Sequence, residues 1–169
     1  MIAAALMAVI LSGQGNLRAT TLYWDPNGVS SGVAVSSTAS GTWTTASGTT
    51  NWNTAIDGSG STGPWTNLDD AVFSAGTGIT IGTVTMGSAV SVNSISFNEG
   101  AMTITTPASD SITVGAGGIT IASGATASIG NAASAAGVNM FTCSALPRPY
   151  PGYSSSTLSP ASLKITRSV

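Results

Sequence analysis

The segment from Ala71 to Ile129 alternates apolar and polar residues with a period of two, which restricts it to short β-strands. Its apolar positions are Val72 and then the pairs Ile79/Ile81, Val84/Met86, Val90/Val92, Ile95/Phe97, Met102/Ile104, Ile112/Val114 and Ile119/Ile121. The intervening residues are mostly Thr, Ser or Gly, so each strand offers one face to a core and the other to water. Glycine and proline between the pairs keep each strand to about four or five residues.

Many short strands joined by small turns are typical of a sandwich, a barrel or a β-solenoid (β-helix). Medium-sized β-branched residues dominate the apolar positions and suit the narrow core of a solenoid. Strand pairs also recur at about 20–24 residues, a plausible length for one coil. We therefore predict an all-β fold and favour the β-solenoid, in which each coil buries only a few side chains against its neighbours.

The distribution of charge limits the partners of the chain. Charged residues make up 6% of the sequence and hydrophobic residues 42%, so the composition is not that of a disordered protein. All six acidic residues lie between Thr20 and Val138, where there is no Lys, Arg, His or Cys. Because phosphate binding depends on Lys and Arg, we expect neither nucleic acid nor an anionic membrane surface as a partner.

The N-terminus reads as an export signal. Met1 to Leu11 is almost entirely apolar, which is too short to span a bilayer but matches the hydrophobic region of a signal peptide. Cleavage after Ala19 fits the small residue there, and Gly13 and Gly15 offer an alternative site. The competing interpretation is a buried N-terminal helix. We predict that residues 1–19 are removed, and that the mature chain is exported without a membrane span.

Four regions follow from these patterns. Residues 1–19 are the predicted signal peptide, 20–70 a Trp-rich N-terminal cap, 71–138 the solenoid coils, and 139–169 an irregular C-terminal tail that is disordered or foreign to the fold. The tail holds four of the seven prolines and three of the four basic residues, with no alternation. It also holds the only cysteine, Cys143, so no intramolecular disulfide is expected.

The four tryptophans are the only candidate binding residues. Large rings can fill the interior of the cap, which we favour, because other large apolar groups are few in this region. Alternatively, exposed indole faces could stack on sugar rings and contact a glycan. These candidate glycan-contact residues are Trp24, Trp43, Trp52 and Trp65.

Three motifs that suggest chemistry are better explained by local structure. Residues 28–32 match the Gly-x-Ser-x-Gly nucleophile pattern, but the chain has no His to activate the serine. Residues 58–63 match Gly-x-Gly-x-x-Gly, but Pro64-Trp65 follows where a dinucleotide site requires a helix. Asp69 and Asp70 point to opposite faces of a strand, and turn hydrogen bonds explain them better than a Ca²⁺ site. We predict no catalytic, metal or cofactor-binding residues and no enzymatic activity.

Several blocks of Trp, Asn and Asp resemble the N-terminal part of bacterial autotransporter-associated β-strand repeat proteins. The blocks are Tyr23-Trp24-Asp25-Pro26-Asn27-Gly28, Gly41-Thr42-Trp43, Asn51-Trp52-Asn53, Trp65-Thr66-Asn67, Asp69-Asp70-Ala71-Val72-Phe73 and Val92-Asn93-Ser94-Ile95-Ser96-Phe97-Asn98. The resemblance implies a right-handed β-solenoid at the cell surface, associated with the outer membrane, in a structural or adhesive role. The chain departs from the family because it lacks repeated Gly-Gly-Thr rungs.

These inferences predict an exported, non-enzymatic, structural or adhesin-like β-solenoid segment of a secreted or cell-surface protein. The alternative is a carbohydrate-binding module that uses exposed tryptophans, with a cell-surface or extracellular polysaccharide as its partner. A glycan hydrolase or lyase is disfavoured, because β-helix lyases typically use a Lys or Arg base that the strand region lacks.

Overall fold

The computed structural model describes residues 18–28, 39–107 and 110–130 in full, together with the backbones of three later strands. Every regular element among these residues is a β-strand, so the prediction of an all-β fold is confirmed. The predicted signal peptide, apart from Arg18 and Ala19, lies outside the described residues.

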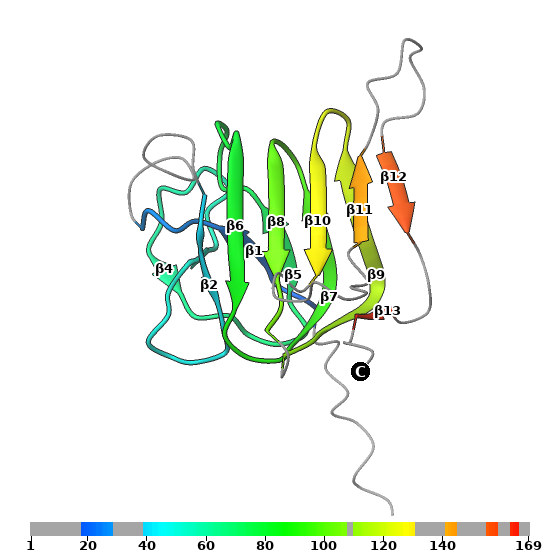
Figure 1. Ribbon diagram of the computed structural model, residues 1–169. Helices are drawn as coiled ribbons and strands as arrows, with labels where there is room; N and C mark the ends of the chain where they lie inside the picture. Colours follow the sequence, from blue (N-terminus) through cyan, green and yellow to red (C-terminus); the bar gives the residue numbers. More distant parts are fainter. Residues whose placement is uncertain are drawn as a thin grey trace, which may run out of the picture.

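Two sheets make up the fold (Figure 1). The fully described strands are β1 (Thr21–Trp24), β2 (Gly41–Trp43), β3 (Trp52–Asn53), β4 (Thr62–Gly63), β5 (Asp70–Phe73), β6 (Ile81–Met86), β7 (Val90–Phe97), β8 (Ala101–Thr105), β9 (Ile112–Ala122) and β10 (Thr126–Gly130). The first sheet has the order β12-β9-β7-β5-β1-β3-β4, with β13 also paired to β9, and the second has the order β11-β10-β8-β6-β2. Both sheets mix parallel and antiparallel pairs, and neither closes on itself.

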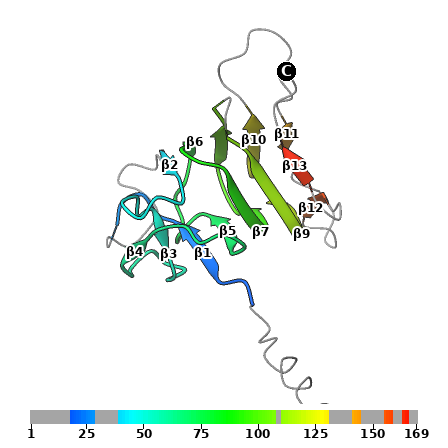
Figure 2. The same cartoon turned by 90° about the horizontal axis from the view of Figure 1, so that it is seen from below.

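From β5 onward the chain alternates between the two sheets, and each strand pairs in parallel with the strand two elements earlier. In the first sheet residues 73, 97 and 121 are level with one another, so the chain returns to the same height every 24 residues. In the second sheet Val84 is level with Ile104, and Ile104 with Ile129. Figure 2 shows the two sheets as separate layers.

The core lies between the layers and consists of apolar side chains stacked in register. Phe73 and Phe97 are both fully buried, and their rings are stacked with centroids 5.2 Å apart. Ile121 continues this column on β9. In the second sheet Val84, Ile104 and Ile129 form a matching buried column. Alternation along each strand therefore places its apolar residues inside, as the period of two predicts.

One predicted pair departs from this rule. Ile79 is buried but precedes β6, whereas Ile81 begins β6 and is 57% exposed. The inward positions of β6 are Gly82, Val84 and Met86, so Ile81 falls on the outward phase of the strand. The expectation that Ile79 and Ile81 form a pair on one strand is wrong.

The Trp-rich region lies at one end of the parallel arrangement. β1 pairs in parallel with β5, and β3 pairs antiparallel with β1, followed by β4. In the second sheet β2 is the edge strand and pairs in parallel with β6. The short antiparallel strands β3 and β4 therefore end the first sheet on this side.

Three short strands lie in the segment predicted to be irregular. They are β11 (Phe141–Ser144), β12 (Ser155–Leu158) and β13 (Leu163–Ile165). β11 pairs antiparallel with β10, while β12 and β13 pair antiparallel with β9. The expectation of irregular structure is wrong for these strands, because the free edges of β9 and β10 provide hydrogen-bonding groups that a short extended segment can satisfy. The rest of 139–169 lies outside the described residues.

Candidate functional site

The four tryptophans form a single buried aromatic cluster. Trp24 and Trp43 are fully buried, and Trp52 and Trp65 are only 2% and 3% exposed. The ring centroids of Trp24 and Trp52 are 5.2 Å apart, and those of Trp43 and Trp65 are 5.0 Å apart, both edge-to-face. Trp24, Trp43 and Trp52 also contact the ring of Phe73. Such geometries are the preferred ones for aromatic pairs.

Burial of the tryptophans decides between the two interpretations of them. Stacking on a sugar requires an exposed ring face, and none of the four indoles offers one. The expectation of exposed, glycan-contacting rings at Trp24, Trp43, Trp52 and Trp65 is therefore wrong in this conformation. The physical reason is that the loops around β1 to β4 bring few other large apolar groups, so the indoles bury one another.

A buried polar pair lies beside this cluster. Asp25 and Asn53 are both fully buried, and the Asn53 side-chain amide donates to Asp25 Oδ2 at 2.8 Å. The other carboxylate oxygen, Oδ1, has no hydrogen-bond partner. Burial raises the pKa of Asp25, against the lowering effects of hydrogen bonds from Asn53 and the backbone of Asn27. Asp25 is the one carboxyl group here whose ionisation is opposed by its surroundings.

The Gly-rich loop at residues 58–63 serves the same polar pair. Asn53 Nδ2 donates to the Gly60 carbonyl at 2.7 Å, and a Cβ at Gly60 would lie 2.7 Å from Asn53 Oδ1. Gly60 therefore allows the loop to approach Asn53 closely. The other glycine motif, at 28–32, lies outside the described residues except for Gly28.

Asp69 and Asp70 hold backbone and side chains of neighbouring strands. Asp69 Oδ1 accepts from the Thr20 backbone N–H at 2.8 Å, whereas Asp70 Oδ1 accepts from Asn93 and Ser94 at 2.7 and 2.6 Å. The two carboxylates thus bind different partners, as their alternation on an extended chain predicts. This arrangement agrees with the interpretation of these aspartates as turn and capping residues.

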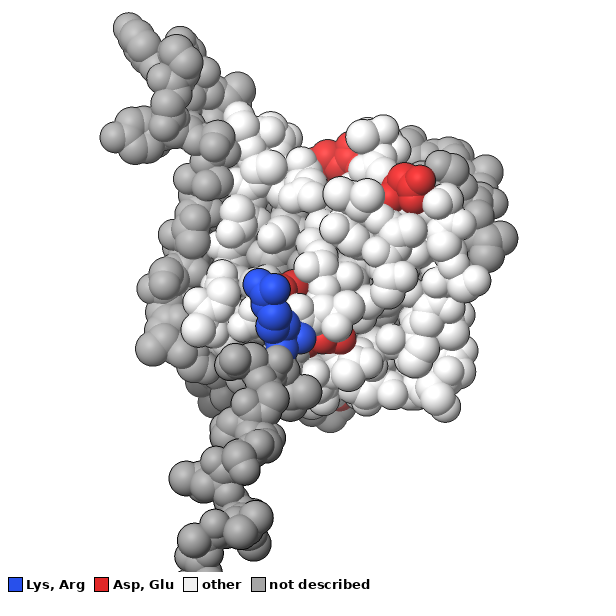
Figure 3. Space-filling view, turned by 180° about the vertical axis from the view of Figure 1, so that it is seen from behind, with Lys and Arg blue, Asp and Glu red and all other residues white. Residues whose placement is uncertain are grey.

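The remaining acidic residues are likewise dispersed. Glu99 accepts from Ser74 Oγ at 2.7 Å and from the Gly78 N–H at 3.0 Å, which links two successive turns. Asp57 accepts from the backbone and hydroxyl of Ser59, and the backbone hydrogen bond holds the pKa of this exposed carboxyl below its usual value. Figure 3 shows acidic side chains in separate places on the back of the molecule. Within the described residues, no three His, Cys, Asp or Glu side chains gather as metal ligands would.

The outward face of the second sheet is the most regular surface of the described structure. We call it the threonine face, and it consists of Thr42, Thr83, Thr85, Thr103, Thr105, Thr126 and Ser128. Thr42, Thr83 and Thr85 are exposed, and the others are half-buried by their neighbours. The sequence shows the underlying signal as Thr-x-Thr at 83–85 and again at 103–105. Alternation predicts that such residues meet water, but only the register shows that they align across strands.

No family model, curated protein or solved structure matches the chain. The resemblance to autotransporter-associated repeat proteins therefore stays a prediction. None of the described residues belongs to a helix with the length and hydropathy needed to cross a membrane.

Proposed function

We propose that the strand region is a right-handed β-solenoid that acts as a structural or adhesin-like segment of an exported cell-surface protein, without enzymatic activity. The observation that carries the proposal is the 24-residue return of the chain in the first sheet, at residues 73, 97 and 121. Parallel pairing at a constant interval is what a stack of coils requires, because each coil must place equivalent residues above those of the previous one.

The turns support the same architecture. Glu99 connects the loop after β5 with the loop after β7, so its carboxylate joins two successive coils. Asp70 on β5 does the same for Asn93 and Ser94 on β7. Polar contacts that repeat from one coil to the next stabilise a stack along its axis. The Trp cluster forms the cap, because it fills the end of the interior where no preceding coil covers the core.

Duplication of one coil tests the architecture. A second copy of residues 98–121 inserted after Ile121 adds 24 residues, which is one full return. We expect the variant to keep a β-rich circular dichroism spectrum and cooperative unfolding, while small-angle scattering shows a longer particle. The matched control duplicates only residues 110–121, which shifts the register by half a coil and exposes apolar positions. Loss of folding in the full-coil variant, or equal tolerance of both insertions, would contradict a solenoid.

Cell-surface exposure is tested in the organism that encodes the chain. Antibodies raised against folded protein should label intact cells, and the mature N-terminus should lie at Thr20. Incubation of the purified chain with a panel of polysaccharides should release no product. Labelling only after permeabilisation, an intact Met1, or release of sugars would each contradict part of the proposal.

A further inference from the structure

The threonine face is a two-dimensional lattice. Thr85 on β6 is level with Thr42 on β2 and Thr105 on β8. One step along the strands, Thr83 is level with Thr103, which is level with Ser128. Strands in a sheet lie about 4.7–4.9 Å apart, and alternate residues of a parallel strand lie about 6.6 Å apart. The hydroxyl groups therefore repeat in two directions at fixed intervals.

The lattice is held rigidly from below and from the side. Val84 and Ile104 are fully buried directly between the outward threonines of β6 and β8. The Thr105 hydroxyl lies 3.3 Å from both the Thr85 hydroxyl and the Val84 carbonyl. Threonine is also stiff at χ1 because it is branched at Cβ. Binding to such a surface requires little loss of side-chain entropy.

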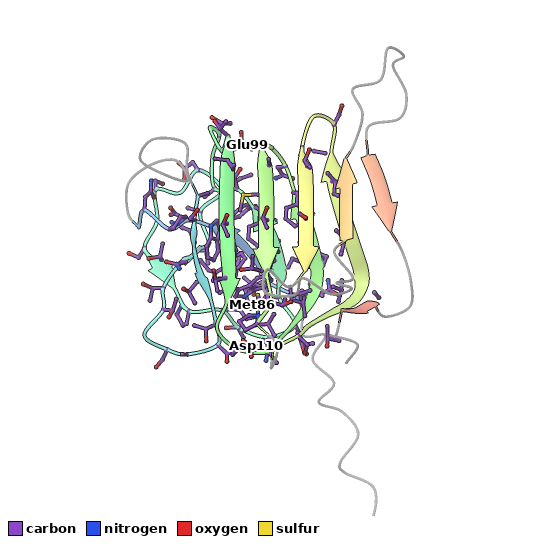
Figure 4. The ribbon with its side chains drawn as sticks, in the orientation of Figure 1. Met86, Glu99 and Asp110 are labelled. Carbon is purple, nitrogen blue, oxygen red and sulfur yellow. The ribbon has the colours of Figure 1, made fainter. Side chains whose placement is uncertain are left out.

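The chemistry of the face restricts its partner. β2, β6, β8 and β10 contain no Asp, Glu, Lys or Arg, so the face carries no charge to attract an ion or a charged polymer. It contains no aromatic ring on its outward side, so it offers no platform for sugar stacking. Each threonine presents a methyl group beside a hydroxyl group. Figure 4 shows Glu99 and Asp110 at opposite ends of the strands, away from this face.

We propose that the threonine face binds ordered water at the surface of ice. The two repeats of the lattice are close to those between oxygen atoms on the prism face of hexagonal ice. That surface is neutral, as the threonine face is, and the hydroxyls can join its hydrogen-bonded network while the methyl groups order the water between them. This inference goes beyond the proposed structural role and does not depend on export.

The test measures partition of the intact protein into slowly grown ice, together with inhibition of ice recrystallisation. Wild-type protein should enter the ice and keep crystals small. Replacement of two central residues, Thr83→Tyr with Thr103→Tyr, places bulky rings above the lattice while retaining strand propensity. The variant should need about tenfold more protein for the same inhibition, equivalent to a loss of about 1.4 kcal/mol in binding.

Thr21→Tyr is the matched control, because Thr21 is an exposed strand residue of the first sheet. It should behave as wild type does. Thr83→Lys is a second variant that places a charge at an exposed position of the lattice, and it should also lose inhibition if the double variant fails to fold. Exclusion of wild-type protein from ice, or full activity of either folded variant, overturns the proposal. Thr83-dependent retention on insoluble cellulose or chitin, or Thr83-dependent dimerisation without ice binding, also overturns it in favour of another partner.

Discussion

At the scale of single residues, the fold depends on small side chains that make room for large ones. Gly82 occupies an inward position of β6 level with Met102, and a Cβ there would lie 2.6 Å from Met102 Sδ and 2.9 Å from the Ala39 carbonyl. Gly41 similarly leaves space for Trp24. Alternation in the sequence marks Gly82 as an interior position, but it does not show which side chain fills the gap.

Gly82→Val should therefore destabilise the protein by about 1–3 kcal/mol, the usual cost of overpacking a core. Met102 can move away from the added methyl groups, but the Ala39 backbone cannot do so as easily. Urea unfolding followed by tryptophan fluorescence measures the change, since all four indoles are buried. Gly48→Ala is the control, because a Cβ at Gly48 meets nothing within 4 Å. An unchanged unfolding midpoint for Gly82→Val would show that the interior is not packed as described.

Asp25 gives the protein a stability that falls as pH rises. Its pKa is raised by burial, so the folded state keeps its proton at pH values where the unfolded chain has released it. The favourable contribution is complete below the ordinary carboxyl pKa of about 3.9 and is lost as pH rises through the higher folded value. Compared with Asp25→Asn, wild type should therefore lose relative stability as pH increases from about 3.5 to 7. A flat difference across this range in urea titrations would contradict the burial of an ionisable group at this site.

Asp57 should show the opposite dependence. Hydrogen bonds from Ser59 lower its pKa, so its contribution is present above the ordinary carboxyl pKa and is lost as pH falls. The difference between wild type and Asp57→Asn should consequently grow as pH rises, and it should be small because the residue is exposed. Parallel titrations of the two variants check the signs against each other. Equal slopes for Asp25→Asn and Asp57→Asn would show that burial does not distinguish the two carboxyls.

At the scale of elements, the sequence predicts most of the central strands and few of the peripheral ones. β6 to β10 coincide with the alternating segments because each buries one face, which leaves a clear period of two. β3 and β4 are two residues long, too short to show any period. β9 runs through Gly115 to Gly118, where glycines suggest a break, because the register shifts there beside Asn93. Added Cβ atoms at Gly115 or Gly117 would approach the Asn93 carbonyl, which explains why only glycine fits.

The stacked pair of Phe73 and Phe97 should carry much of the cohesion between β5 and β7. Both rings are fully buried, so Phe97→Ala should cost about 3–5 kcal/mol, from lost burial and the resulting cavity. Phe97→Leu keeps most of the volume and should cost about 1.5 kcal/mol or less. Chemical denaturation of both variants measures the difference. Equal destabilisation by Ala and Leu would argue against a tightly packed column.

At the scale of the whole molecule, the sequence predicts an all-β chain but not how its sheets are arranged. Coil length can be read approximately from the recurrence of strand pairs, and the structure gives 24 residues in the first sheet. The positions of the four tryptophans show only that large rings occur near the N-terminus. Their mutual burial depends on contacts between segments up to 41 residues apart in the chain, from Trp24 to Trp65, which local patterns do not encode.

Removal of one coil should leave a folded but weaker protein. Deletion of residues 98–121 joins Phe97 to Ala122 and takes out β8 and β9, after which β10 can pair with β6 in the register that β8 occupied. Each removed interface lowers the free energy of unfolding, because a stack is stabilised by contacts between neighbours. Circular dichroism and urea unfolding should show β structure with a lower midpoint. A variant that is unfolded, while deletion of 110–121 alone is tolerated, would contradict interchangeable coils.

The antiparallel strands at both ends have a consequence for how copies of this molecule behave together. A run of parallel rungs with bare ends is a template onto which another molecule can add, and repeated addition gives a fibril. β3 and β4 on one side, and β11 to β13 on the other, reverse direction and occupy those templates. Such terminators keep the particle finite, so the chain can accumulate at high concentration without polymerising end to end.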